Sequence, residues 1–178
     1  MTEEQALVQQ ARQGDEGAFA ALVEQNQGRI YHLALRMTGN PDDAAELCQE
    51  AFLNAWKGLG KFQGESSFST WLYRIAYNVF YDYIRSRKET TELDSREVDA
   101  TNSVEQENVG QRMDIYQSLE KLKEVERTCI TLFYMEDVSI DKIAGIVGIP
   151  AGTVKSHLSR GKEKLAMYLK QNGYDGNR

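Results

Sequence analysis

The chain has 178 residues, of which 41% are hydrophobic and 27% charged, a composition typical of a soluble globular protein with one large or two small domains. No apolar run approaches the length of a membrane span, and the acidic N-terminus is unlike a secretory signal, so we expect a cytoplasmic protein with no direct membrane insertion. The net charge is -6, but residues 1–60, 61–88, 89–126 and 127–178 carry -5, +3, -7 and +3, so nucleic-acid contact is expected only in the second and fourth segments.

Apolar residues at helical spacing predict a first helix that ends before a break at residues 39–41; its stripe contains Phe19, Leu22, Val23, Ile30, Leu33, Ala34 and Met37. Asp42 and Asp43 favour the start of a second helix, which runs to about Leu59, because carboxylates stabilise the positive end of the helix dipole. Its apolar side contains Ala44, Leu47, Cys48, Ala51, Phe52 and Ala55. The opposite side carries Glu46, Gln49, Glu50, Leu53, Asn54 and Lys57. A Leu among carboxylates and amides fits either a partner-docking face or a solvated face.

A loop with glycine and serine at residues 61–68 leads into an aromatic-rich helix at residues 69–88. The core side of this helix is predicted to contain Leu72, Ile75, Ala76, Val79 and Tyr83. The other side carries Trp71, Arg74, Asn78, Tyr81, Asp82 and Arg85. Interleaved rings, amides and cations are suited to stacking unpaired bases and gripping their backbone. Core packing of the rings is the alternative, above all for Trp71.

Residues 89–110 lose the helical periodicity and gather acidic groups, which predicts a flexible linker. We therefore expect two helical domains, at residues 1–88 and 111–172, followed by a frayed tail at 173–178. Apolar positions predict two further helices at the start of the second domain: Met113, Tyr116, Leu119 and Leu122, then Val125, Cys129, Leu132 and Phe133. No stretch has the two-residue period of a strand, so the predicted fold class is all-α.

The stretch from Ile140 to Leu158 has the residue types of a DNA-binding helix-turn-helix. Ile143 and Val147 are predicted to line the buried face of its first helix, and Val154 and Leu158 that of its second. The small Ala144 allows a close crossing, Gly148 and Ile149 form the corner, and Pro150 opens the second helix. The outer face carries hydroxyls and cations suited to phosphates and base edges: Thr153, Lys155, Ser156, Ser159, Arg160 and Lys162. An ordinary helical hairpin inside a bundle is the alternative.

These segments occur in the order found in the extracytoplasmic-function sigma factors, the small two-domain specificity subunits of bacterial RNA polymerase, and the chain resembles that family over nearly its whole length. DDAAELCQEAFLNAW resembles the family's polymerase-docking helix, FQGESSFSTWLYRIAYN its strand-melting motif, and IPAGTVKSHLSRGKEKL its upstream promoter-reading helix. The resemblance implies three partners: core RNA polymerase, promoter DNA as duplex and as separated strand, and an anti-sigma factor that holds the protein inactive until a signal arrives.

The resemblance also implies roles for particular residues. Those expected to dock core polymerase are Glu46, Gln49, Glu50, Leu53 and Asn54. Those expected to capture a flipped minus-ten base and hold the separated strand are Gly64, Glu65, Ser66, Ser67, Phe68, Trp71, Arg74 and Asn78. Those expected to read the minus-thirty-five element in the major groove are Thr153, Lys155, Ser156, Ser159 and Arg160. The acidic linker is expected to lie near the RNA exit path.

Two other functions are compatible with parts of the sequence. A dimeric activator or repressor could use the same helix-turn-helix, although the strand-melting helix would then have no role. An enzyme is the second alternative, but neither His32 nor His157 has a nucleophile or carboxylate in a recognisable motif, so we expect no catalytic residues. The two histidines and the two cysteines, Cys48 and Cys129, lack metal-ligand spacing, so buried thiols are expected and a disulfide framework, a metal site and a cofactor are not.

Overall fold

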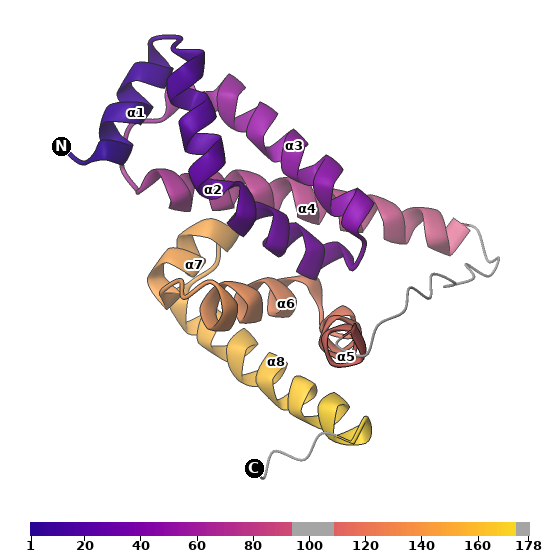
Figure 1. Ribbon diagram of the computed structural model, residues 1–178. Helices are drawn as coiled ribbons and strands as arrows, with labels where there is room; N and C mark the ends of the chain where they lie inside the picture. Colours follow the sequence, from indigo (N-terminus) through magenta and orange to yellow (C-terminus); the bar gives the residue numbers. More distant parts are fainter. Residues whose placement is uncertain (94–108, 174–178) are drawn as a thin grey trace.

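The computed structural model describes residues 1–93 and 109–173, in which every regular element is a helix. The helices form two domains, α1 to α4 and α5 to α8, and the second packs beneath the first in the view of Figure 1. The elements are α1 Glu3–Arg12, α2 Glu16–Thr38, α3 Pro41–Gly58, the short 3-10 helix η1 Leu59–Lys61, α4 Phe68–Leu93, α5 Val109–Glu120, α6 Glu124–Ile130, the π-helical turn η2 Thr131–Met135, α7 Ile140–Val147 and α8 Ala151–Gln171. Within these ranges no helix is long and apolar enough to cross a membrane.

Local chemistry sets the junction between α2 and α3. Gly39 ends α2 in the left-handed conformation, with φ of 68°, which a residue with a side chain rarely adopts. The Asn40 side chain then accepts hydrogen bonds from the first backbone N–H groups of α3, at Asp42 and Asp43. Fully buried alanines on the inner side of α3 allow the helices to approach closely; they are Ala44, Ala51 and Ala55. The predicted apolar stripe of this helix is confirmed.

Helix α1 was not predicted, although its start carries a recognisable signal. The Thr2 side chain accepts from the Gln5 N–H, and the Gln5 side chain accepts from the Thr2 N–H, which makes a capping box. Val8 and Ala11 are buried and attach the helix to the domain. The Thr-x-x-Gln spacing is thus the sequence signal that indicates the start of this helix.

The helix-turn-helix is confirmed as α7, a corner and α8. Gly148 occupies the left-handed region with φ of 77°, and its N–H donates to the Ala144 carbonyl. The buried face of α7 differs in part from the prediction, because Ile143 and Ile146 are buried while Val147 is only half-buried. Ile146 lies three residues after Ile143, and this step also returns to the same face of a helix.

A close contact and a buried cation hold the second domain together. A Cβ atom placed on Gly161 of α8 would lie 2.9 Å from Cγ1 of Ile130, so the two helices touch where this residue has no side chain. The Arg127 guanidinium is buried and donates to the carbonyls of Leu119, Glu120 and Leu122. These carbonyls lie at and just beyond the C-terminal end of α5, where a positive charge is favoured.

The two domains contact each other through a polar interface, which we call the interdomain latch and which consists of Arg36, Tyr73, Lys88, Glu124, Arg127 and Glu136. Arg127 Nη1 donates to the Met37 carbonyl near the end of α2, at 2.6 Å. Glu136 accepts from Arg36 Nη1 at 2.8 Å and from the Tyr73 hydroxyl at 3.3 Å. Lys88 of α4 forms an ion pair with Glu124 of α6.

The latch explains why Tyr73 and Tyr77 are buried although neither belongs to the predicted core side of α4. The second domain covers them, and that contact cannot be read from the periodicity of one helix. Burial, together with the nearby carboxylate of Glu136, raises the pKa of Tyr73. Burial also raises the pKa of Tyr77 to about 12, and nearby Tyr81 and Cys129 add to this effect.

Both ends of the predicted linker are helical, because α4 continues to Leu93 and α5 begins at Val109. Residues 94–108, the rest of that linker, lie outside the described residues, as do residues 174–178 of the predicted tail.

Candidate functional site

The outer face of α3 presents every residue predicted to dock a partner. Leu53 is 57% exposed, and the other four are also exposed: Glu46, Gln49, Glu50 and Asn54. Beside Leu53 lies a hollow of about 520 Å³ between α2 and α3, with Phe19, Val23, Phe52 and Trp56 among its lining residues. An exposed leucine next to an apolar hollow favours a docking face over a merely solvated one.

The loop before α4 is an exposed arch between two buried rings, and we call residues 63–67 the arch. Phe62 and Phe68 are 7% and 2% exposed, with ring centroids 6.3 Å apart, whereas all five arch residues are exposed. Gly64 adopts a positive φ of 73°, which favours glycine at this position. Ser67 Oγ accepts from the Thr70 N–H and so caps the start of α4. Phe68 therefore anchors the arch from inside and is not available as a surface residue.

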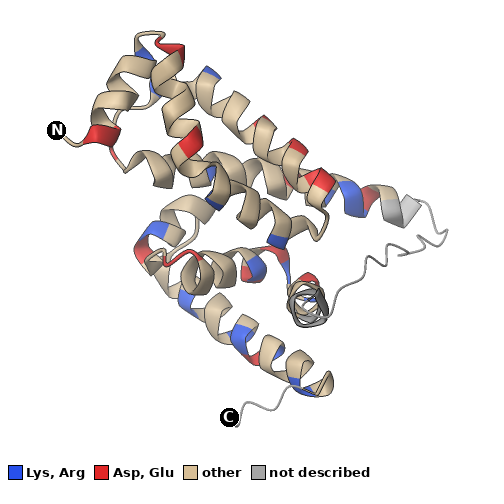
Figure 2. Ribbon diagram, viewed as in Figure 1, with Lys and Arg blue, Asp and Glu red and all other residues tan. Residues whose placement is uncertain are grey.

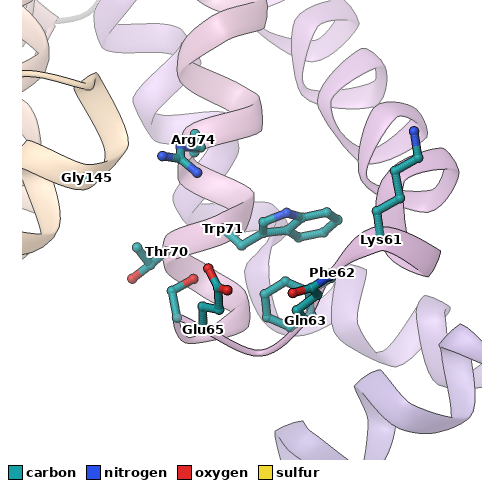
Figure 3. A pocket seen from close by; sticks show the side chains of 9 residues that line it. Lys61, Phe62, Gln63, Glu65, Thr70, Trp71, Arg74 and Gly145 are labelled. Atoms are coloured by element: carbon teal, nitrogen blue, oxygen red, sulfur yellow. The ribbon is translucent and has the colours of Figure 1, made fainter.

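Trp71 lies between the core and a pocket, so its ring packs partly against core rings and partly lines a surface hollow. It is half-buried, with its ring 4.9 Å from Phe62 and 5.8 Å from Phe68 between centroids. It also lines a pocket of about 380 Å³, together with Lys61, Phe62, Gln63, Glu65, Ser66, Thr70, Arg74 and Gly145. Figure 3 shows the Trp71 ring lying near Phe62 and the Arg74 side chain on the side of α4 that faces Gly145. A ring next to an exposed cation suits an unpaired base and its phosphate.

Asn78, one helical turn beyond Arg74, is exposed on α4 as predicted. The sequence placed three further residues on the outward side of α4, and these differ in their exposure. Asp82 and Arg85 are exposed, whereas Tyr81 is half-buried with its ring 5.8 Å from that of Tyr77.

The outer face of α8 carries the residues predicted to enter the major groove. Lys155, Ser156, Ser159 and Arg160 are exposed, and Thr153 is half-buried. Figure 2 shows basic residues spaced along this helix. Lys164 is excluded from that surface, because its Nζ lies 2.9 Å from Oε2 of the buried Glu126.

Long-range packing brings α7 to the pocket that Trp71 and Arg74 line, which the sequence did not indicate. Gly145 of α7 is part of the pocket wall, opposite residues of the arch and of α4. The first helix of the helix-turn-helix therefore borders the surface proposed for the separated strand.

The two cysteines are buried and unpaired, which confirms their predicted state. Burial raises the pKa of Cys48, and burial followed by the charge of Glu126 raises that of Cys129 to about 11, so neither thiol is activated. No group of three His, Cys, Asp or Glu side chains able to hold a metal ion occurs in the part of the chain that the structure describes.

Known families and proteins match both domains. Residues 22–90 match the model of sigma-70 region 2, and residues 112–165 match that of sigma-70 region 4. The ECF RNA polymerase sigma factor SigW of Bacillus subtilis is 36% identical over 92% of this chain and 95% of that protein. The ECF RNA polymerase sigma-E factor of Escherichia coli K12 is 32% identical over 91% of this chain and 92% of that protein.

Two solved structures share the fold. The sigma factor RpoE of Bartonella quintana, in complex with the anti-sigma factor NepR, has a TM-score of 0.75 at 24% identity and covers 90% of this chain and 98% of that one. CnrH, in complex with the cytosolic domain of CnrY, has the same TM-score and identity and covers 96% and 99%. The chain thus belongs to the extracytoplasmic-function sigma factors of the sigma-70 family, the non-catalytic subunits that direct RNA polymerase to promoters.

Proposed function

We propose that this chain performs promoter recognition with three separate surfaces, one for polymerase and two for DNA. The α3 face would dock core polymerase, with Leu53 as the apolar anchor inside a ring formed by Glu46, Gln49, Glu50 and Asn54. Interface anchors are typically apolar or aromatic groups surrounded by polar contacts that exclude water, and the exposed Leu53 has that arrangement.

The pocket between the arch and α4 would hold a flipped minus-ten base. This pocket is the observation that carries the proposal, because a half-buried Trp71 and an exposed Arg74 line the same hollow. Arch residues Gly64 to Ser67 would shape the pocket, Phe68 would anchor it, and Asn78 would contact the strand farther along α4. Ring stacking on a single-stranded base contributes on the order of 1 to 3 kcal/mol, which offsets the cost of unstacking.

The exposed side of α8 would read the minus-thirty-five element in the major groove, with Lys155 and Arg160 as the cations. Thr153, Ser156 and Ser159 would supply hydroxyls to phosphates or base edges. We assign these roles to domains at residues 1–88 and 111–172, joined by the linker between them.

Promoter binding also requires the domains to separate. The two promoter elements lie about 25 base pairs apart, which at about 3.4 Å each is roughly 85 Å of duplex. Domains held together by the latch are too compact for that distance, since a compact chain of 178 residues has a radius of gyration of about 16 Å. The overall charge of -6 also gives the free chain little attraction for DNA. We therefore expect polymerase docking to hold the domains apart.

We further propose that an anti-sigma factor restrains the protein in the cytoplasm. Two similar folds were solved as complexes, one with an anti-sigma factor and one with a cytosolic domain of a second protein. The apolar hollow next to Leu53 offers such a partner a site that overlaps the polymerase-docking face.

Runoff transcription and binding with core polymerase test the assignments. Leu53→Asp should weaken polymerase binding by roughly 30-fold or more, because it places a charge in the centre of the docking face. Gln25→Asp, at an exposed position of α2, is the control. Arg160→Ala should leave docking unchanged and weaken upstream duplex binding roughly tenfold, with exposed Lys170→Ala as its control. Unchanged binding in both variants would show that the surfaces are assigned wrongly.

A further inference from the structure

The arch has a hollow on each side. The pocket with Trp71 and Arg74 lies on one side, and a larger hollow of about 810 Å³ lies between the arch and α1. Both volumes are in the range of ligand sites. Four residues line both hollows: Phe62, Gln63, Glu65 and Ser66. The segment that precedes α4 runs alongside α1 in Figure 1. The shared lining residues place the two hollows next to each other at the arch.

Helix α1 is tied to the end of the arch by one side chain. Glu4 is half-buried, and its Oε1 accepts a hydrogen bond from the Phe68 N–H at 3.3 Å. Phe68 is the first residue of α4, where backbone N–H groups have no partner within the helix and a negative charge is favoured. Ser67 Oγ accepts from Thr70 in the same turn. Two acceptors from distant parts of the chain therefore fix the point at which the arch ends.

Neutral donors and acceptors are the largest group among the residues that line the second hollow. Helix α1 contributes Gln5 and Gln9, its N-cap contributes Thr2, and the arch contributes Gln63, Ser66 and Ser67. Glutamine amides pair with base edges, since each offers both a donor and an acceptor.

The charges of this hollow indicate which part of a nucleotide it accepts. The carboxylates of Glu4 and Glu65 both line it, so a phosphate inside it would be repelled. Its cationic side chain is Arg12, the last residue of α1, which suits a phosphate at the edge of the hollow.

We propose that the hollow between α1 and the arch is a second base subsite for the separated promoter strand, next to the one at Trp71, and that Glu4 is the positioning residue that holds the arch between them. The proposal rests on the proposed function of the Trp71 pocket. It extends strand binding to a helix that lies outside the matched residues 22–90.

Abasic scanning tests the subsite in the complex with core polymerase. The probe is a fluorescent single-stranded oligonucleotide enriched from a randomised pool by the wild-type complex, with one base removed at each position in turn. In the wild type, removing the captured base or its neighbour should each weaken binding roughly tenfold. In Gln9→Ala the penalty at the neighbouring position should disappear while that at the captured position remains. Trp71→Ala should give the opposite pattern.

Controls separate this proposal from the proposed function. Gln10→Ala, an exposed position on α1 that does not line the hollow, should retain both penalties. If Gln9→Ala also retains both, the second subsite is wrong while the Trp71 pocket stands. If Trp71→Ala retains both, or the wild type has none, the proposed function of the pocket fails.

Glu4 is tested by a pair of substitutions. Glu4→Gln keeps an oxygen that accepts from Phe68 and should retain both abasic penalties. Glu4→Ala removes the acceptor and should lower both, with unchanged affinity for core polymerase. Equal behaviour of the two variants in the scan would overturn the positioning role.

Discussion

The latch carboxylate Glu136 is the best place to test whether the free chain holds its domains together. Its side chain is only 10% exposed and accepts from two groups of the first domain, Arg36 and Tyr73. Glu136→Gln keeps the size and one acceptor oxygen but removes the charge. Hydrogen bonds to charged groups contribute about 1.5 to 3 kcal/mol each. Rehydration of both partners on opening offsets part of this, so we expect a net loss of about 1.5 kcal/mol, which is roughly a tenfold increase in the open population.

The reactivity of Cys129 measures this equilibrium. The thiol is fully buried in α6, and its neighbour Thr128 has its hydroxyl 3.4 Å from Sδ of Met37 in the first domain. Helix α6, which carries Cys129, also packs against α4 of the first domain. With Cys48→Ala in the background, Cys129 is the single thiol, and its labelling rate reports how often it becomes accessible.

Labelling in the Glu136→Gln variant should therefore be about ten times faster, with unchanged helix content. Glu163→Gln, at an exposed position of α8, is the control and should label at the parental rate. Equal rates in the two variants would refute the reasoning that this carboxylate holds the domains together. A faster rate accompanied by loss of helix content would refute it as well, because the second domain would then be unfolding.

Two further predictions concern packing and pH. Gly161→Ala should destabilise the second domain by about 1 to 3 kcal/mol and lower its melting temperature, since the new methyl would meet Ile130. Gly152→Ala is the control, because this glycine has open space around it, and it should not lower the melting temperature. Equal melting temperatures of the two variants would contradict the close contact. The raised pKa values of Tyr73 and Tyr77 mean that both phenols stay protonated in the closed state. Their contribution to the stability of the closed state is therefore complete below the ordinary pKa of 10, and it is lost as the pH rises from there through about 12. Small-angle scattering should show the molecule expanding over that range, and Tyr77→Phe should move the expansion to higher pH; an unchanged radius while the tyrosines titrate would contradict it.

The sequence predicted what depends on local chemistry. Gly148 at the corner and the buried alanines of α3 follow from steric and packing needs that operate over a few residues. Polar residues opposite an apolar stripe correctly indicated the exposed faces of α3 and α8, apart from Thr153, which is half-buried. The match to the sigma-factor family then decided against the two alternative functions, a repressor and an enzyme.

The sequence could not predict contacts between distant residues. Tyr73 is buried because Glu136 and its domain cover it, and these residues are 63 positions apart in the chain. The same applies to Arg36, which meets Glu136 across 100 positions. The apolar steps of α4 fix one buried side, but a second domain adds another, and no periodicity within a single helix contains that information.

Arg127 has a consequence for how the domains can part. Three of its four carbonyl acceptors belong to its own domain, and only Met37 belongs to the other. When the domains separate, one N–H exchanges its carbonyl for water while the other bonds persist. In the open arrangement proposed above, the cation would keep three carbonyl acceptors, so the two domains could part as rigid bodies without rebuilding α5 or α6.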